Sequence, residues 1–377
     1  MPSRDIHSNW GAPPWAIDFV PSPPEKLPDV ADFAVVGAGF TGLAAAAWLR
    51  HLDSSQSVVV LEAGAIGAGA SGRTGGMALA ETAAGDQPGL GDVLPGFQEI
   101  LKILRVDCDL DLRGAWEIGR ADGKKDSLIS WRDSGTLRVV KEVPGGTLDP
   151  GKLVAGLARA AESLGARIFE RDPVEAIEWS DPIALAVRGK KFRARKILFA
   201  TNALALDLAG EGGGMHPRLT LAVLSRPVPE DVLARIGLAP RKPFYTVDFP
   251  YLWGRVRRDN SVIWGAGLVS SPDERHLDGV DVSSEEPSGI FASLEERVRG
   301  LHPALAATEF THRWGGPILF RDSWTPVFDW HTSSRNAIVL GAFAGHGVAL
   351  SSYLGAWAAE ALLRGRELPH WGELHKP

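Results

Sequence analysis

One glycine-rich stretch constrains the fold of this chain more than any other feature. An apolar run that ends at Val36 leads into Gly37, Gly39 and Gly42, and an alanine-rich run continues to Leu49. A strand, a tight turn and a helix with this spacing present unpaired N–H groups and a partial positive charge to a pyrophosphate. The sequence therefore predicts an α/β domain with a phosphate cradle. The expected cradle residues are Gly37, Gly39, Phe40, Thr41 and Gly42.

An acidic residue follows the cradle at a characteristic distance. A second apolar run, Val58–Leu61, ends in Glu62, 20 residues after Gly42, with Ala63 beside it. An acid at about this distance binds the ribose hydroxyls of an adenosine. A glycine turn without a ligand is the alternative, but the strand, the helix and the acid together favour dinucleotide binding.

The bulk composition excludes several classes of protein. A chain of 377 residues with 45% hydrophobic residues predicts about two domains, and a net charge of −6 gives no reason to expect nucleic acid or an anionic membrane as a partner. The basic stretch 190–196 runs into an apolar strand and is expected to be a solvated hairpin. The single cysteine, Cys108, excludes an intrachain disulfide and a multi-cysteine metal site, so no metal is predicted.

The N-terminal segment has an unusual composition. Residues 1–30 contain seven prolines together with Trp10 and Trp15, and they predict an extended arm anchored by the tryptophans. No signal-peptide pattern and no membrane-spanning apolar run is present, so we expect a cytoplasmic protein whose partner is a small molecule. The sequence sets no oligomeric state.

A second segment of small residues makes the chain resemble a known family. Residues 64–76 are dense in glycine, alanine and serine, which suits backbone packed beside a flat ligand. VGAGFTGL and VVVLEAGAIGAGASGRTGG resemble the D-amino-acid-oxidase-like FAD-dependent oxidoreductases, in particular their gamma-glutamylputrescine oxidase-like branch. The resemblance implies α/β architecture, with a Rossmann-type FAD-binding domain and an α+β substrate domain built on an antiparallel sheet. It implies FAD contacts at Ser71, Gly72, Arg73, Thr74, Gly75 and Gly76.

Further motifs extend the resemblance along the chain. Asp149 and Pro150 form a helix start like that of the family's second helix. The resemblance places the backbone of Val174 against adenine and the ATNA motif at the edge of the sheet, with Ala200, Thr201 and Asn202 as contacts. A late strand and glycine turn precede a helix whose dipole faces the pyrimidine end of the flavin, where it favours the negative charge of the reduced ring. The residues of this turn are Gly345, His346, Gly347 and Val348.

The same resemblance divides the chain into parts. We expect an arm at 1–30, an FAD-binding domain from 31–82, 147–216 and 326–377, and a substrate domain from 83–146 and 217–325. Trp253-Gly254-Arg255 matches the family's aromatic-aromatic-Arg strand except for Gly254, which predicts a gap in the wall of the site. The segment between Gly119 and Thr147 is short for this branch, so the substrate channel is expected to be more open, or covered by the arm or another subunit.

The implied chemistry is oxidation of a C–N bond. A hydride equivalent leaves the carbon that bears an amine or amino-acid nitrogen, water hydrolyses the imine, and dioxygen reoxidises a non-covalent FAD, although a histidine linkage stays open. Arg255, Arg313 and His346 are the catalytic candidates, and Tyr251, Trp253 and Arg255 the substrate contacts. The alternatives are a surface position for Arg255 and a structural role for His346. Trp264 could join the aromatic wall of Tyr251 and Trp253, but we favour ordinary core packing for it.

The lysine distribution supports two other functions. Sarcosine-oxidase relatives use a substrate-domain lysine for the reaction with oxygen, whereas no lysine occurs here between Pro243 and His375. One alternative is therefore an FAD dehydrogenase of a hydroxy acid or amine that uses another electron acceptor. The other is a flavin-binding accessory subunit without turnover.

Overall fold

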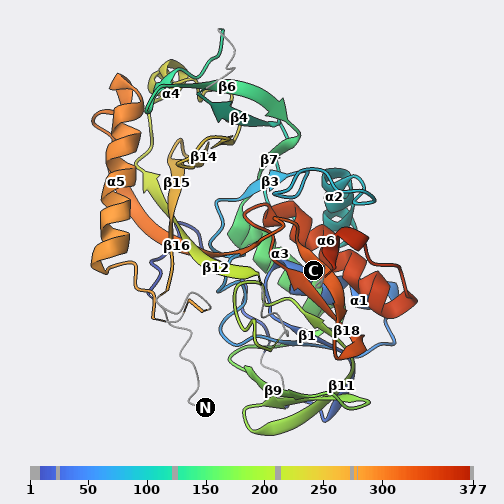
Figure 1. Ribbon diagram of the computed structural model, residues 1–377. Coiled ribbons are helices and arrows are strands. Elements are labelled where there is room, and N and C mark those ends of the chain that lie inside the picture. Colours follow the sequence, from blue (N-terminus) through green and yellow to red (C-terminus); the bar gives the residue numbers. More distant parts are fainter. Residues whose placement is uncertain are drawn as a thin grey trace.

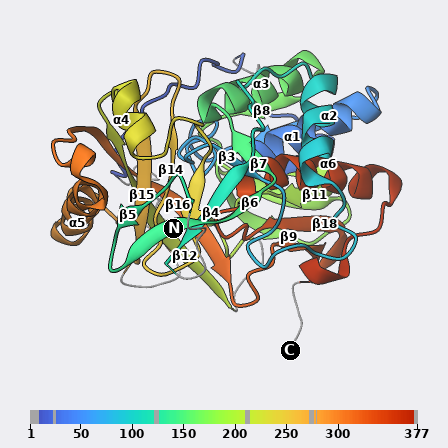
Figure 2. The ribbon, with the colours of Figure 1, turned by 90° about the horizontal axis from the view of Figure 1, so that it is seen from above.

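The computed structural model describes residues 9–22, 26–120, 126–208, 214–271, 276–277 and 279–373. Two eight-stranded sheets form the centres of two domains (Figure 1). Seen from above, α1, α2, α3 and α6 gather on one side of the molecule and α4 and α5 on the other (Figure 2). The predicted fold class is confirmed, whereas the arm residues 1–8 and 23–25 lie outside the described part of the chain.

The first sheet holds the glycine motif. Its strands follow the order β17-β18-β11-β1-β2-β8, and the central strands run parallel, with β9 and β10 as an antiparallel extension beside β11. Strand β2 and residues 33–36 of β1 are buried on both faces, which explains why they are apolar. The bounds are β1 Val30–Val36, β2 Val58–Leu61, β8 Arg167–Phe169, β9 Val174–Glu178, β10 Ile183–Val187, β11 Lys190–Phe199, β17 Val327–His331 and β18 Ser334–Gly341.

Four helices pack on the first domain. They are α1 (Phe40–Leu52), α2 (Val93–Ile103), α3 (Pro150–Ser163) and α6 (Gly347–Arg364). The carboxylate of Asp149 accepts the N–H of Lys152 at 3.0 Å, as expected for the N-cap of α3. Helix α2 falls within 83–146, expected to belong to the substrate domain, but it packs on α6 in the same core as α1.

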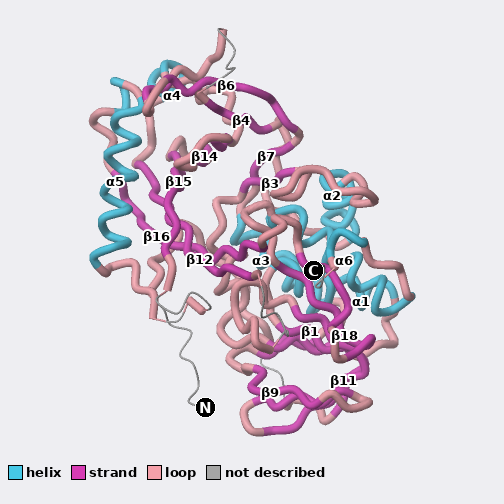
Figure 3. Tube along the Cα trace, in the orientation of Figure 1, coloured by secondary structure: helices cyan, strands magenta, loops and turns pink. Residues whose placement is uncertain are grey.

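The second sheet forms the other domain. Its order is β16-β12-β15-β14-β13-β4-β6-β5, and its pairs are antiparallel except for β13 with β4. In Figure 3, α5 runs along one side of these strands and α4 lies near β6. The bounds are β4 Ala115–Gly119, β5 Trp131–Arg132, β6 Thr136–Val143, β12 Met215–Ser225, β13 Phe244–Thr246, β14 Trp253–Val256, β15 Val262–Val269 and β16 Phe310–Arg321; α4 is Glu230–Arg235 and α5 Glu285–Leu301.

Smaller elements complete the fold. Strands β3 and β7 form a two-stranded sheet at the crossing between the two domains, and two short 3-10 turns follow α5 and α6. Their bounds are β3 Met77–Leu79 and β7 Gly145–Thr147, with the turns at Pro303–Leu305 and His370–Gly372.

The two faces of the second sheet have different roles. Phe244 and Trp264 lie on the face that packs on α5, and their rings contact Trp131. Trp264 is fully buried there, so its interpretation as a core residue is confirmed. Successive side chains of a strand alternate between its faces. Trp253 precedes Gly254, which pairs with Trp264, so the Trp253 side chain points the other way, toward the first domain.

The gap predicted at Gly254 is absent. Gly254 lies on the face toward α5, and a Cβ atom there would overlap the carbonyl oxygen of Ile263 and lie 2.7 Å from the Phe244 ring. Phe244 therefore fills the space beside Gly254, and the wall toward the first domain is unaffected. The prediction was wrong because it placed residue 254 on the wrong face of β14.

The arm runs along the edge of the second sheet that β16 forms. The carbonyl of Trp10 accepts the N–H of Gly315 at 2.7 Å, and the indole N–H of Trp15 donates to the carbonyl of Gly72 at 2.7 Å. This edge is the end of the sheet away from β4 and β6. The described arm therefore does not cover the shortened segment between Gly119 and Thr147.

Close contact between α1 and α6 generates a stability prediction. A Cβ atom at Gly355 would lie 2.5 Å from the carbonyl oxygen of Thr41, so Gly355→Ala forces the helices apart. We expect a loss of about 1–3 kcal/mol in the free energy of unfolding of the flavin-free protein, measured by urea denaturation. Gly289→Ala on α5 is the control, because open space surrounds Gly289. It should be neutral or stabilise by about 0.5–1 kcal/mol, and equal effects of the two substitutions would contradict the prediction.

Candidate functional site

The glycine turn after β1 is closed to side chains. Gly37 has a φ of +105°, and its Cβ position lies 2.7 Å from the carbonyl oxygen of Ala200. A Cβ atom at Gly42 would overlap the carbonyl oxygen of Gly37. The N-terminal turn of α1 therefore lies directly over the turn, and its first N–H groups lack intrahelical partners. The hydroxyl of Ser71 accepts one of them, that of Phe40, at 2.9 Å.

Glu62 closes the other side of this turn. Its carboxylate accepts the N–H groups of Ala38 at 2.7 Å and Gly64 at 2.8 Å. Burial raises the pKa of Glu62, the two N–H groups counteract this, and the nearby charge of Glu170 adds to the rise. A buried carboxyl beside the glycine turn suits an adenosine ribose, whose hydroxyls supply the donors that a buried acid needs.

Arg73 lies in the segment of small residues but points away from the turn. Its guanidinium donates to the carbonyls of Gly11 at 2.7 Å and Gly315 at 3.1 Å, with a longer bond to Trp10 at 3.3 Å. The indole N–H of Trp314 donates back to the Arg73 carbonyl at 2.9 Å. Arg73 therefore ties this segment to the arm and to β16.

Trp253 and Arg255 bring the second sheet onto the same segment. The Trp253 ring fills the space beside Gly75, where a Cβ atom would overlap it. Arg255 is 7% exposed and donates from Nε to the carbonyl of Gly75, and burial lowers its pKa to about 10. The alternative of a surface arginine is therefore wrong. Tyr251, two residues before Trp253, is 40% exposed on the preceding loop.

Arg313 lies elsewhere. Its position on β16 pairs with Val223, on the face toward α5, where its Nε donates to the carboxylate of Glu295 at 2.6 Å. The structure does not bring Arg313 to the other candidates.

The C-terminal glycine turn faces the second sheet. Gly345 has a φ of +92°, and His346 precedes Gly347 and Val348 in the first turn of α6. Within the described part of the chain, Nδ1 of His346 is shielded from solvent and has no hydrogen-bond partner. Burial lowers the pKa of His346, which favours the neutral ring. The ring lies 6.4 Å from that of Tyr245, nearly perpendicular to it.

Tyr245 and Glu117 are polar residues that sequence reasoning missed. The Tyr245 hydroxyl donates to the Glu117 carboxylate at 3.0 Å, and burial followed by this carboxylate raises the tyrosine pKa. Glu117, Tyr245 and Trp253 lie directly opposite one another on β4, β13 and β14, and therefore share one face. The detectable signal was an acid inside the apolar run Ala115–Gly119.

The ATNA motif connects neighbouring strand ends at the edge of the first sheet. The side chain of Asn202, at a φ of +47°, accepts the N–H of Ala342 at 3.0 Å, and Ala200 packs on Gly37. Thr201 lies between them, and Val174 is buried at the start of β9. The motif joins the ends of β11 and β18 beside the cradle.

Other classes of site find no support in the described ranges. No group of three His, Cys, Asp or Glu residues there could hold a metal ion. Burial, followed by the charges of Asp107 and Asp109, raises the pKa of Cys108 to about 12, so its thiol is unreactive. No helix in this part of the chain is long and apolar enough to cross a membrane.

The contacts of Arg73 yield a prediction about flavin retention. Arg73→Ala removes the donor to four carbonyls, those of Trp10, Gly11, Ala68 and Gly315, and leaving them unsatisfied costs about 1–3 kcal/mol each where they are buried. We expect release of the flavin to be at least about tenfold faster, measured by the rise in flavin fluorescence on dilution.

Two further variants test whether Arg73 acts through the arm. Deletion of residues 1–22 should have a similar effect, and adding Arg73→Ala to the deletion should add little. Arg159→Ala is the control, because Arg159 binds the exposed carbonyl of Asp18 farther along the arm. Additive losses would show that Arg73 acts independently of the arm.

Comparisons with known proteins agree with this geometry. The family model described as FAD dependent oxidoreductase (DAO) matches residues 32–361. The gamma-glutamylputrescine oxidoreductase of Escherichia coli is 26% identical over 90% of this chain and 87% of its own length. The probable oxidoreductase OrdL of Haemophilus influenzae is 26% identical over 90% and 85%.

Solved structures share the fold. Glycine oxidase from Geobacillus kaustophilus superposes with a TM-score of 0.73 at 19% identity, covering 93% of this chain and all of its own. The L-amino acid deaminase from Proteus vulgaris gives 0.72 at 17% identity, covering 95% of this chain and 100% of its own. The family match spans both sheets and the glycine cradle, and it confirms the predicted family and cofactor. This chain is a member of the DAO family of FAD-dependent oxidoreductases.

Proposed function

We propose that this enzyme oxidises the C–N bond of an amine or amino acid to an imine. The observation that carries the proposal is the hydrogen-bonded pair of Tyr245 and Glu117, which faces His346 across the two domains. The relatives named gamma-glutamylputrescine oxidoreductase, glycine oxidase and L-amino acid deaminase support it, because all three names denote nitrogen-bearing substrates.

The described residues suit FAD in two places. The glycine turn at Gly37–Gly42 would hold the pyrophosphate, and Glu62 the ribose. The N-terminal turn of α6 would hold the pyrimidine end of the flavin, where its dipole favours negative charge. When bound, FAD supplies the acceptor for the two electrons that leave the substrate.

The charges on the second sheet favour a cationic substrate group. Glu117 would bind the ammonium, while the hydroxyl of Tyr245 keeps its carboxylate oriented. Burial and the charges of Asp86 and Glu117 raise the pKa of Glu81, which places Glu81 within the same negative field. The ring of Trp253 excludes water from the segment beneath it. Nε of Arg255 is bonded to Gly75, so a substrate carboxylate would use the terminal nitrogens of Arg255.

Glu117→Gln tests the role of Glu117 on the substrate side. It keeps the size of the side chain and removes the charge, so the substrate should bind about 10–100-fold more weakly, as expected for a lost charge-assisted hydrogen bond of about 1.5–3 kcal/mol. The measurement is the concentration dependence of anaerobic flavin bleaching. Glu309→Gln is the control, because Glu309 forms an exposed ion pair with Arg226. Unchanged substrate affinity in Glu117→Gln would exclude Glu117 from binding.

The function itself is tested by bleaching the flavin without oxygen. The holoenzyme is mixed with a panel of amines, amino acids and hydroxy acids, and air is then readmitted. We expect bleaching by at least one nitrogen-bearing compound, and rapid return of colour in air if dioxygen is the acceptor. Bleaching by hydroxy acids alone, or by no compound, would refute the proposal.

A further inference from the structure

The loop between β13 and β14 exposes apolar side chains. Val247 is 47% exposed, Phe249 71% and Tyr251 40%, and adjoining exposed apolar side chains mark a binding site more often than single ones do. The ring of Phe249 packs on that of Tyr251, with the centroids 4.6 Å apart. The two rings therefore form one apolar surface at the tip of this hairpin.

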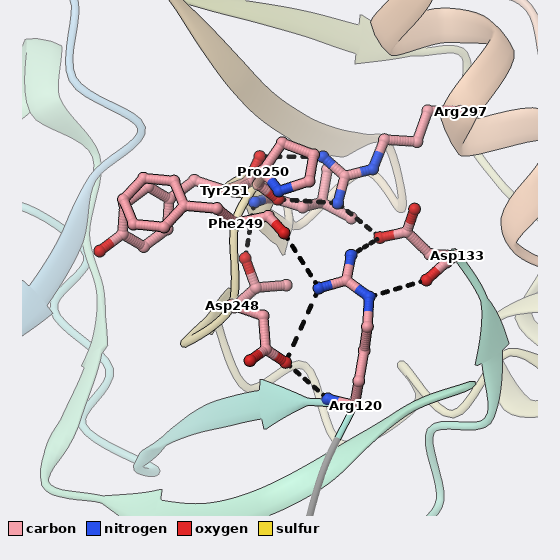
Figure 4. Close-up of polar contacts among 9 residues, drawn as sticks. Arg120, Asp133, Asp248, Phe249, Pro250, Tyr251 and Arg297 are labelled. Carbon is pink, nitrogen blue, oxygen red and sulfur yellow. Dashed lines mark hydrogen bonds and ion pairs between the residues drawn. The ribbon is translucent and has the colours of Figure 1, made fainter. Parts of the chain in front are cut away.

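A charged cluster holds this loop and consists of Arg120, Asp133, Arg297 and, from the loop itself, Asp248 (Figure 4). The carboxylate of Asp133 joins two arginines, with Oδ2 at 2.9 Å from Arg120 and 2.6 Å from Arg297. Arg120 follows β4, Asp133 connects β5 to β6, and Arg297 lies on α5, so three separate elements meet at one carboxylate. All three side chains are mostly buried, so salt screens these ion pairs less than surface ion pairs.

The two arginines bind the backbone of the loop directly. Arg120 donates to the carbonyl of Phe249 at 3.2 Å. Arg297 donates to the carbonyls of Pro250 at 2.9 Å and Tyr251 at 3.0 Å. Bonds from a charged donor are about twice as strong as neutral ones. Three consecutive carbonyls are thus held by one charged cluster, which fixes the loop rather than leaving it free to open.

A fourth contact holds the N-terminal end of the loop, at Asp248. The backbone N–H of Arg120 donates to the carboxylate of Asp248 at 2.6 Å, and the guanidinium of Arg120 lies 3.7 Å from the same carboxylate. The charges of Asp133 and Asp248 balance those of Arg120 and Arg297. Replacing Asp133 by a neutral residue therefore leaves two arginines facing each other with one compensating acid.

The fixed loop adjoins the candidate substrate site. Tyr251 precedes Trp253 by two residues, its hydroxyl is close enough to Tyr245 to contribute, after burial and Glu117, to the raised pKa of Tyr245, and the backbone of Leu252 pairs with that of Thr246 next to Tyr245. The rings of Phe249 and Tyr251 therefore extend the aromatic face of Tyr245 and Trp253 outward. This continuity points to the substrate, rather than another protein, as the molecule that covers the rings.

We propose that residues 247–251 form a fixed aromatic wall at the mouth of the substrate site, and that Asp133 positions it by joining Arg120 to Arg297. Phe249 and Tyr251 bind the apolar body of an amine, so the site favours amines with a hydrophobic group over short ones. The proposal of an amine ligand depends on the proposed function, whereas the fixation of the loop does not.

The fixation is tested by limited proteolysis of the holoenzyme with chymotrypsin, which cleaves after Tyr251 when the loop is free. The wild type should resist cleavage at this bond, and Asp133→Asn should be cut there at least about tenfold faster, with unchanged flavin absorbance. Asp133→Glu should restore part of the resistance. Asp231→Asn is the control, because Asp231 forms an exposed ion pair on α4. Equal cleavage rates in the wild type and Asp133→Asn would overturn the fixation of the loop.

A second variant keeps this test valid if Asp133→Asn fails to fold. Arg297→Lys retains the positive charge but loses the planar fork that reaches both Pro250 and Tyr251. It should also be cleaved faster than the wild type, and resistance equal to the wild type would overturn the proposed positioning.

The substrate wall is tested with benzylamine and methylamine as probes, by calorimetric titration of the holoenzyme. The wild type should bind benzylamine at least about tenfold more tightly than methylamine, because the phenyl ring is buried against the wall. Phe249→Ala should reduce this ratio several-fold with little change for methylamine. An unchanged ratio of the two affinities in Phe249→Ala would refute the proposed aromatic wall. Binding of neither amine, with the loop still resistant to chymotrypsin, would instead refute the amine substrate.

Discussion

The architecture depends on the exclusion of side chains at the glycine turn. Because a Cβ atom at Gly42 would overlap the carbonyl oxygen of Gly37, α1 can begin directly above the end of β1 only with glycine at this position. The carbonyl of Thr41 lies against Gly355 on α6, so the two helices proposed to supply N–H groups to FAD are packed against each other. The proposed phosphate cradle and the helix proposed to face the flavin are therefore parts of one packed unit.

Two arginines, Arg73 half-buried and Arg255 buried, join this unit to the second sheet in opposite directions. Arg73 leaves the first domain and binds a carbonyl of β16, at Gly315, while Arg255 leaves β14 and binds a carbonyl of the first domain, at Gly75. A guanidinium shielded from water needs acceptors, which four backbone carbonyls provide for Arg73 and the carbonyl of Gly75 provides for Arg255. This reciprocal bonding connects the two domains beside the place where Tyr245, bonded to Glu117, faces His346.

Local signals in the sequence were sufficient for the glycine turn and the elements next to it, but not for the place of α2 in the first domain. The cradle, Glu62 and the N-cap at Asp149 depend on residues close in sequence, and the structure has the predicted elements there. The second sheet depends on register between distant strands. The faces occupied by Gly254 and Arg313, and the meeting of Tyr245 with Glu117, follow from that register and could not be derived from spacing alone.

The central claim is that electrons reach FAD from a C–N bond, and a single turnover without oxygen tests it most directly. The holoenzyme is mixed with a nitrogen-bearing substrate, and the reduced flavin, the carbonyl product and the released ammonia or amine are each quantified. The account predicts one carbonyl and one nitrogen product for every flavin reduced, because water hydrolyses the imine. Reduction of the flavin with no nitrogen released would contradict it.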